Sequence, residues 1–221
     1  MNTAKLIWAT PSADNLLGYV ARVSNPSNQN NPDVGKLLRY CAKNAHWSVF
    51  EHAHACIEIT TTRDIGRQII RHRSFAFSEF SQRYADVTEI GDDVVFRECR
   101  MQDMKNRQNS LVIDENNDDD YLIARHWEQW QQDLWNEAIK KYKAALALGI
   151  AKEQARALLP EGLTTSRLYM TGSLRSWITY CQVRLDPTTQ KEHRLVAQQV
   201  LSVLREVAPI TMDAFFPKEK E

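Results

Sequence analysis

Residues 54–73 read HACIEITTTRDIGRQIIRHR, and this stretch decides the fold because a strand pattern leads directly into a helix pattern. From His54 to Thr60 polar and apolar residues alternate, which predicts a half-buried β-strand. Thr62 and Asp64 then provide the side-chain oxygens with which helices begin. The chain is therefore expected to contain both strands and helices.

Further elements are predicted outward from this stretch by periodicity and by start and stop signals. The run over residues 71–84 is expected to begin at a helix end and to continue as irregular or extended chain. Another strand is expected over 93–100 and a polar loop over 101–120. Helices are expected over 35–46, from the acidic end of that loop to Gly149, over 151–159, from Ser173 through Val183, and from a Thr189–Glu192 capping box to Pro209. Residues 1–221 contain neither an internal repeat nor a linker, so we expect one domain.

Composition restricts the kinds of partner and compartment. The chain has 28 Lys plus Arg and 28 Asp plus Glu, so its bulk charge predicts no nucleic-acid or membrane partner. No apolar run approaches the roughly 18 residues of a membrane span, and the N-terminus lacks a signal-peptide pattern. The four cysteines are scattered without paired spacing. These features favour a cytoplasmic location.

The run over residues 71–84, RHRSFAFSEFSQRY, is the clearest functional signal. It places three guanidiniums, an imidazole, a carboxylate and three serine hydroxyls among aromatic residues. Guanidinium groups donate paired, charged hydrogen bonds to phosphates and carboxylates, so the run is interpreted as an anion-binding and catalytic element. If residues 79–84 are extended, Glu79, Ser81 and Arg83 project to one side, where they would hold a sugar and a phosphate.

Two other kinds of site are alternatives to this interpretation. His46, His52 and His54, with Glu51, are potential metal ligands and favour a metal-dependent hydrolase, but their spacing matches no understood metal motif, so no metal site is predicted. No glycine-rich phosphate loop or dinucleotide fingerprint is present. A phosphate-binding module without redox chemistry is a second alternative, and it predicts strongly salt-dependent binding.

The ordered motifs carry a family resemblance. Arg71-His72-Arg73, followed by seven residues and Ser81, resembles the RHRx7S signature of flavin-dependent thymidylate synthases. The agreement includes Gln68, Glu79, Arg184 and residues 50–52, 82–84, 155–163 and 171–178, so it spans nearly the whole chain.

The resemblance implies reductive methylation of dUMP to dTMP. Methylenetetrahydrofolate would donate the carbon, FAD would carry the hydride, and NADPH would reduce the FAD. It also implies an α/β fold, with a central, mainly antiparallel sheet flanked by helices and long helices in the C-terminal half. A homotetramer whose active sites draw on several subunits is expected.

Residue roles follow from the same resemblance. Arg184 matches the catalytic arginine that polarises the uracil, and His46 matches a histidine near the flavin that is implicated in methylene transfer. The residues implied to bind dUMP are Gln68, Glu79, Ser81, Gln82, Arg83, Arg156 and Arg184, with Arg156 coming from another subunit. The residues implied to bind FAD are Ser24, Arg71, His72, Arg73, Glu79, Ser173, Arg175 and Thr179. Ser173 and Thr179 stand where some members have Asn, and Thr188 where some have His.

Overall fold

The computed structural model describes residues 2–90, 94, 96–114 and 116–217. Its strands are β1 (Thr3–Ala9), β2 (His54–Thr62), β3 (Ala76–Glu79), β4 (Arg100–Gln102), β5 (Ser110–Val112) and β6 (Thr165–Ser173). Its α-helices are α1 (Ala13–Ala21), α2 (Gly35–Lys43), α3 (Arg63–Ile69), α4 (Asp118–Ala147), α5 (Lys152–Ala155), α6 (Leu174–Arg184), α7 (Lys191–Val207) and α8 (Pro209–Phe215). Short 3₁₀ helices cover Pro26–Asn28, Trp47–Glu51, Val87–Ile90 and Arg156–Leu158.

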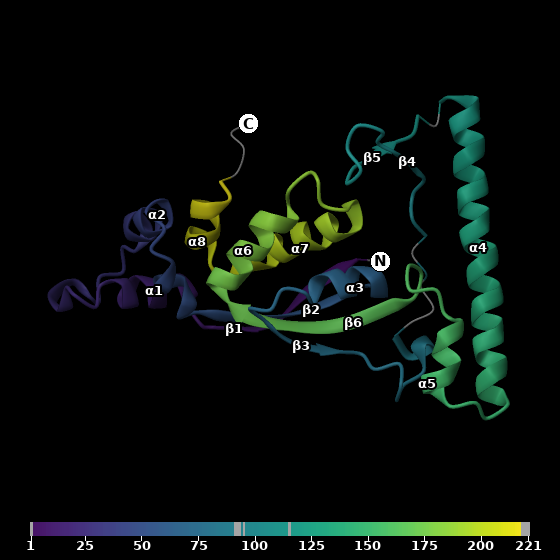
Figure 1. Ribbon diagram of the computed structural model, residues 1–221. Coiled ribbons are helices and arrows are strands. Elements are labelled where there is room, and N and C mark those ends of the chain that lie inside the picture. The colour runs from purple at the N-terminus through teal and green to yellow at the C-terminus, as the bar shows by residue number, and fades with distance from the viewer. Residues whose placement is uncertain (1, 91–93, 95, 115, 218–221) are drawn as a thin grey trace.

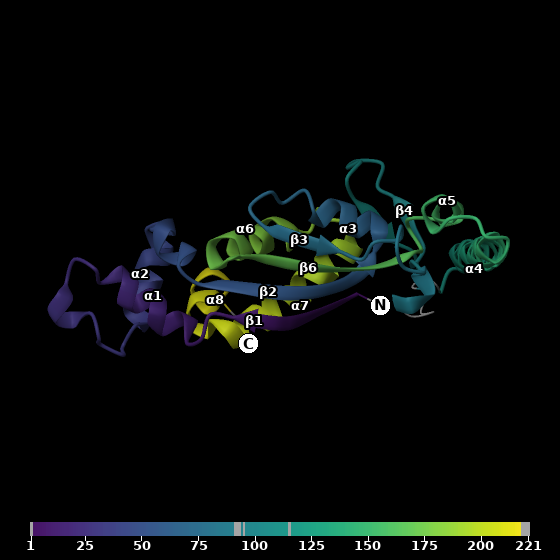
Figure 2. The same cartoon turned by 90° about the horizontal axis from the view of Figure 1, so that it is seen from below.

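The central sheet is antiparallel and has the strand order β1-β2-β6-β3 (Figure 2). β2 pairs with β6 along its whole length, so that His54 lies opposite Ser173 and Thr62 lies opposite Thr165. The strand predicted from the alternating pattern is confirmed and continues two residues beyond Thr60. Because β2 runs into α3 and β6 runs into α6, both helices that carry the arginine motifs start from neighbouring strands.

Helices α3, α6 and α7 lie on one face of this sheet (Figure 1). The core between the two layers is fully buried and includes Ile57, Ile59, Leu168, Met170, Trp177, Val196 and Val200. The α/β class, the mainly antiparallel sheet and the long helices of the C-terminal half are therefore confirmed.

The residue Phe75, which follows the Arg71-His72-Arg73 motif closely, packs against the end of β6 just before α6 begins. A Cβ atom on Gly172 would lie 2.5 Å from Cδ1 of Phe75, so only glycine allows this ring to pack here. Ser173 caps α6, as predicted, because its Oγ accepts from the Ser176 N–H at 3.3 Å.

Of the two alternatives for residues 79–84, the structure shows irregular chain, although β3 is extended immediately before it. β3 ends at Glu79, and Ser81 begins a turn in which its carbonyl accepts from the N–H groups of Tyr84 and Ala85, each at 3.1 Å. The row of Glu79, Ser81 and Arg83 that an extended chain would have formed is therefore not present.

The capping box predicted at residues 189–192 is wrong. Gln190 precedes the first residue of α7, and no side chain caps that helix. Thr189 Oγ instead donates to the Val183 carbonyl at 3.1 Å, while Glu192 forms an ion pair with Arg100. The side chains of Thr189 and Glu192 therefore bind other groups and do not form the reciprocal hydrogen bonds of a capping box.

Residues 93–120 differ from expectation in two ways. Where it is described, the chain from 94 to 99 is irregular rather than a strand, and residues 93 and 95 lie outside the described ranges. The predicted loop contains a hairpin formed by β4 and β5. Its connection is a turn in which Asp103 Oδ1 accepts from the N–H groups of Lys105 and Asn106 at 2.8 and 3.1 Å.

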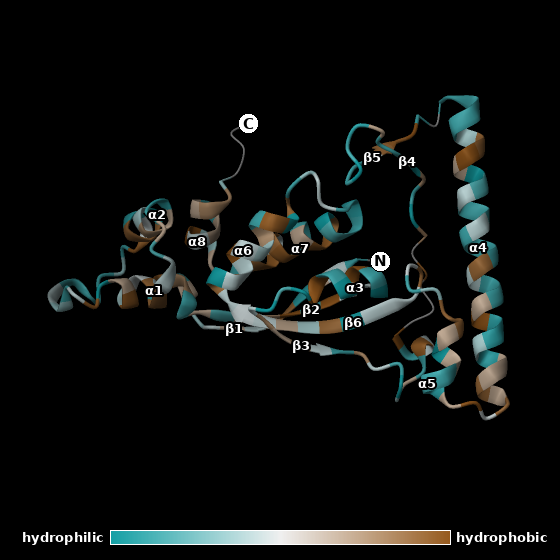
Figure 3. Ribbon diagram, viewed as in Figure 1, coloured by the Kyte–Doolittle hydropathy of each residue, from teal (hydrophilic) through white to brown (hydrophobic). Residues whose placement is uncertain are grey.

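Helix α4 begins and ends as predicted. Asn117 caps its first turn, and Gly149 follows it with a φ of 81°, which glycine adopts without strain. The helix stands at one end of the molecule, and Figure 3 shows apolar segments along it. Trp127 and Trp130 are 37% and 65% exposed, so they do not belong to the core of this chain. None of the helices in the described ranges has a stretch long and apolar enough to span a bilayer.

Candidate functional site

Arg184 is the last residue of α6 and lines a cavity of about 620 Å³. Its Nε donates to Nε2 of His72 at 2.9 Å, which joins the end of α6 to the chain that follows α3. Among the described residues, its two Nη groups have no hydrogen-bond partner. One bond thus fixes the guanidinium, while its paired donors are left for a ligand.

The chemistry of His72 follows from this bond. Nε2 accepts a hydrogen bond, so a neutral ring must carry its proton on Nδ1. Burial and the positive charge of Arg184 lower the pKa of His72 to about 4, so the ring is neutral at physiological pH. The ring packs edge-on against Tyr180, with centroids 5.0 Å apart. His72, expected among the flavin residues, is bonded in this structure to the predicted catalytic arginine.

A second cavity, of about 400 Å³, lies beside α3 and the Arg156–Leu158 turn. Gln82 lines it together with Arg63, Arg67 and Arg156, which makes it rich in positive charge. Nε2 of Gln82 is buried and has no partner among the described residues. A buried amide donor beside guanidiniums is suited to an anionic ligand with oxygen acceptors. Glu153 and Glu161 also line the cavity, with Glu161 3.0 Å from Arg67, and they offset part of this positive charge.

Three other predicted dUMP residues, Glu79, Ser81 and Arg83, lie next to lining residues of this second cavity without lining it themselves. Glu79 accepts from Ser166 Oγ at 2.8 Å and lies 3.9 Å from Arg63. Arg83 is exposed and lies 3.8 Å from Glu153. Ser81, at the start of the turn, is half-buried.

The Glu51 carboxylate contacts two of the predicted flavin residues, Ser173 and Arg175, at the start of α6. Glu51 accepts from Ser173 Oγ at 2.6 Å and from Arg175 Nη1 at 2.9 Å. The hydrogen bond from Ser173 lowers the pKa of this carboxyl, with a further contribution from Arg175. Arg175 also lies over the ring of Trp47, 5.9 Å from its centroid. The one hydroxyl proton of Ser173 is therefore used by Glu51, whereas Arg175 keeps further N–H groups for an anionic ligand at this helix N-terminus.

The remaining predicted flavin residues are on the surface. Arg71 and Arg73 are exposed, and no carboxylate in the described ranges lies within ion-pair distance of either. Thr179 Oγ donates to the Arg175 carbonyl at 3.1 Å, and Ser24 is exposed in the turn after α1. The unpaired guanidiniums of Arg71 and Arg73 fit a diphosphate in charge and chemistry.

His46 follows a strained helix end. Ala45 has a φ of 55°, a left-handed conformation that normally favours glycine. The His46 N–H donates to the Cys41 carbonyl at 2.9 Å, which closes the end of α2. The ring is exposed and lies edge-on to Tyr40, with centroids 5.6 Å apart. No group of three potential metal ligands occurs in the part of the chain that the structure describes.

Three residues that the sequence did not suggest as site candidates, Tyr180, Gln190 and His193, form a hydrogen-bonded group with Gln68. The Gln68 amide contacts His193 and Gln190, and His193 in turn contacts Tyr180. One signal was available: His193 occupies the buried stripe of α7 that continues through Val196 and Val200, where a polar ring is unexpected.

Burial of His193 predicts a pH-dependent stability. Burial and the charge of Arg184 lower the pKa of His193 to about 3, whereas an unfolded histidine titrates near 6.5. The unfolded chain therefore binds a proton that the folded chain does not. The stabilisation is complete above pH 6.5 and is lost, by about 1.4 kcal/mol per pH unit for this residue, as the pH falls toward 3. Urea unfolding between pH 6.5 and 5 should show a smaller slope for His193→Asn. Equal slopes would contradict the burial of a neutral ring.

Comparisons with known proteins converge on one family. A family model described as thymidylate synthase complementing protein matches residues 5–210. The flavin-dependent thymidylate synthase of Synechocystis sp. is 50% identical over 186 residues, which cover 84% of this chain and 81% of that protein. The probable flavin-dependent thymidylate synthase of Paramecium bursaria Chlorella virus 1 is 43% identical over 192 residues, or 86% and 85% of the two chains.

Two solved structures of the UMP/dUMP methylase PolB from Streptomyces cacaoi share the fold. The one bound with 5-Br dUMP aligns with a TM-score of 0.78 at 24% identity and covers 97% of this chain and 94% of that chain. The one bound with 5-Br UMP aligns with a TM-score of 0.76 at 25% identity and covers 97% and 93%.

Proposed function

The chain belongs to the family of flavin-dependent thymidylate synthases, and from this premise we propose how its residues methylate dUMP to dTMP. The family makes the protein an enzyme that uses a flavin. In our proposal, which takes residues 1–221 as one domain, the flavin is FAD, NADPH is its reductant and methylenetetrahydrofolate is the carbon donor. When bound and reduced, FAD supplies the hydride.

The proposal rests on one observation above all: the guanidinium of Arg184 is fixed by neutral His72 while both Nη groups are left unpaired among the described residues. Aimed at a uracil carbonyl, such a cation stabilises the negative charge that develops on the ring during attack. His72 accepts the Nε–H and remains neutral, so it holds Arg184 without competing for its charge. We assign Arg184 as the catalytic residue, with His46 at the flavin ring for methylene transfer.

The cavity beside α3 is proposed to hold the nucleotide phosphate and sugar. Its arginines supply positive charge, and the buried Gln82 amide supplies an unpaired donor. Glu79 and Arg83 approach lining residues of this cavity, and Ser81 precedes Gln82. Gln68 would contribute at the cavity of Arg184 instead, beside Gln190. Glu79 is also proposed to contact FAD.

FAD is proposed to lie at the N-terminus of α6. Arg71, Arg73 and Arg175 would hold its diphosphate, and Ser173 would join them by turning its hydroxyl away from Glu51. His72 would contact FAD while accepting the hydrogen bond of Arg184. Ser24 and Thr179 complete the proposed set. The four free cysteines, none of which the proposal uses, are consistent with a cytoplasmic enzyme.

Shared active sites in a homotetramer are part of the proposal. The cavities that contain Arg184 and Arg156 have no lining residue in common, so one chain does not bring these two arginines into one cavity. Helix α4 exposes Leu122, Trp130 and Leu134, apolar side chains suited to contact with another subunit.

Complementation tests the sharing of sites. Arg156→Ala and Arg184→Ala should each be inactive alone. Co-expressed in equal amounts, they should recover about one quarter of wild-type turnover, because a random tetramer joins two intact arginines in that fraction of sites. Turnover of purified mixed tetramers provides the measurement. If Arg156 acts on the nucleotide of its own chain, the mixture stays inactive.

A spectroscopic experiment tests the flavin chemistry. Purified protein incubated with FAD should be yellow and should lose its flavin absorbance when NADPH is added without oxygen. A folded protein that takes up no FAD, or a bound flavin that NADPH leaves oxidised, would contradict the proposal.

A further inference from the structure

His193 is the buried histidine of α7 that contacts Gln68. Its side chain is fully buried on α7, yet both ring nitrogens have partners. Nδ1 lies 3.2 Å from Oε1 of Gln68, and Nε2 lies 3.2 Å from the hydroxyl of Tyr180. A polar ring in an apolar stripe is costly unless it is hydrogen-bonded, so these contacts specify its orientation.

The neighbouring amide determines which nitrogen carries the proton. Gln68 Nε2 donates to Oε1 of Gln190 at 2.8 Å, so the Gln68 atom that faces His193 is the carbonyl oxygen. A carbonyl only accepts, and the proton of His193 is therefore on Nδ1. In a neutral ring Nε2 then accepts from Tyr180, whose hydroxyl stays protonated because burial raises its pKa.

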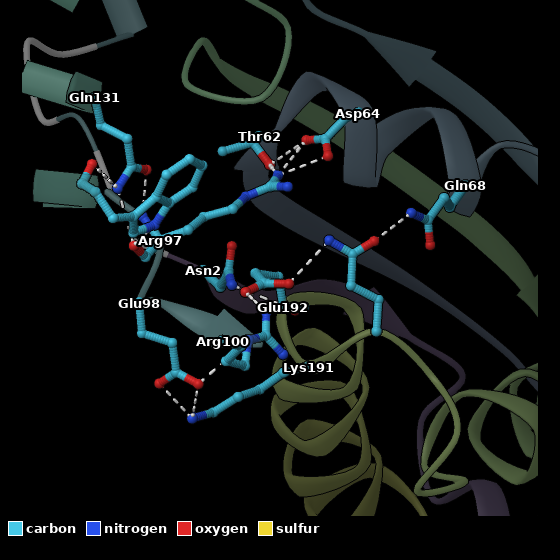
Figure 4. A network of polar contacts seen from close by, with 12 residues as sticks. Asn2, Thr62, Asp64, Gln68, Arg97, Glu98, Arg100, Gln131, Lys191 and Glu192 are labelled. Atoms are coloured by element: carbon cyan, nitrogen blue, oxygen red, sulfur yellow. Dashed lines mark hydrogen bonds and ion pairs between the residues drawn. The ribbon is translucent and has the colours of Figure 1, made fainter. Parts of the chain in front are cut away.

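The carboxylate of Glu192, at the other end of this hydrogen-bond chain, fixes the same direction of donation. Gln190 Nε2 donates to Oε2 of Glu192 at 2.9 Å, and Glu192 is ion-paired with Arg100 (Figure 4). An ionised carboxylate accepts only. Every donor from Tyr180 through His193, Gln68 and Gln190 thus points toward Glu192, and such chains polarise and strengthen their members.

This arrangement leaves one N–H on each glutamine. Gln68 and Gln190 each use the carbonyl oxygen and one amide proton within the chain. Gln190 also lines the cavity of Arg184. We propose that His193 is a positioning residue that acts through Gln68 and orients the free N–H groups of Gln68 and Gln190 toward oxygen atoms of dUMP. The inference rests on the proposed function, since it takes dUMP as the ligand of this site.

A double-mutant cycle measures whether His193 acts through Gln68. The dissociation constant of dUMP is measured by calorimetry on the FAD-loaded enzyme. His193→Leu should raise this dissociation constant about tenfold. Without His193 the Gln68 amide is free to flip, and it then presents its carbonyl oxygen instead of an N–H group to the oxygen atoms of dUMP. His193→Asn, which keeps a donor near Nδ1, should stay within about threefold of wild type. The double variant His193→Leu/Gln68→Ala should bind no more weakly than Gln68→Ala. Gln198→Ala, an exposed glutamine on the same helix, is the matched control and should bind normally.

The outcomes separate the two proposals. Additive losses in the double variant, or equal losses for His193→Asn and His193→Leu, would overturn the role of His193 while wild-type binding of dUMP still supported the function. Failure of the wild type to bind dUMP would overturn both. Nitrogen-15 NMR of the histidines, without dUMP, provides an independent reading: we expect a neutral ring protonated on Nδ1 between pH 6 and 8. A proton on Nε2 would overturn the inferred chain.

Discussion

Arg184→Ala should lower the rate of thymidylate formation by about 10²- to 10³-fold, the loss usual for removing a fixed donor at a developing charge. The structure gives two reasons for a large effect. The guanidinium is oriented by His72, so little reorganisation is needed when charge develops, and its two Nη groups are unpaired among the described residues. Single-turnover assays of dTMP formation measure the change.

Two further variants separate a local effect from a general one. Arg125→Ala removes an exposed arginine on α4 whose partner is Glu128 on the same helix, and it should retain full activity. Arg184→Lys keeps the charge but loses the planar fork and the Nε–H that His72 accepts, so it should remain at least about tenfold slower than wild type. Arg184→Ala should still bind FAD and unfold like wild type. Near-normal turnover in this variant would remove Arg184 from the mechanism.

Trp177→Ala should destabilise the fold by about 3–5 kcal/mol, as expected when a large buried ring leaves a cavity. Trp177 is fully buried between α6 and the sheet, and its ring meets Phe75 edge-on, with centroids 4.7 Å apart. Its Nε1–H donates to the Ala55 carbonyl at 3.1 Å, and the substitution removes this buried hydrogen bond as well. Urea unfolding at fixed protein concentration measures the loss.

Trp177→Phe is the matched variant, because it keeps most of the ring volume and removes the N–H donor. Its cost should be about 1–2 kcal/mol, which separates the hydrogen bond from ring packing. Since Ser173 and Arg184 stand at the two ends of α6, loosening Trp177 should also weaken FAD binding and turnover together. An alanine variant as stable as wild type would show that the ring does not fill the core.

The elements predicted best are those whose pattern is local. Alternation after His54 predicts β2, the oxygens of Thr62 and Asp64 predict the start of α3, and Gly149 predicts the end of α4. The apolar residues of β2 enter the core, and Gly149 adopts the positive φ that ends α4. Helix α3 begins where predicted, although Thr62 makes no side-chain capping hydrogen bond to it. Arg71, His72 and Arg73 could likewise be selected as a functional motif from the sequence.

The elements predicted worst depend on distant partners. Ser81 begins a turn without the Gly, Pro, Asn or Asp residues that usually indicate one. Glu192 is drawn from its expected cap to Arg100, which lies 92 positions away in the sequence. His193 contacts Gln68, which is 125 positions away, and no local pattern predicts a partner at that separation. The pairing of His72 with Arg184 has the same origin, because adjacent strands bring α3 and α6 together.

Release of tritium from dUMP labelled at C5 tests the central claim most directly, because methylation replaces that hydrogen. Wild-type enzyme supplied with FAD, NADPH and methylenetetrahydrofolate should release tritium in step with dTMP formation. It should form no dTMP when either NADPH or the folate is omitted. A folded, flavin-loaded enzyme that releases no tritium and forms no dTMP with all components present would contradict the account.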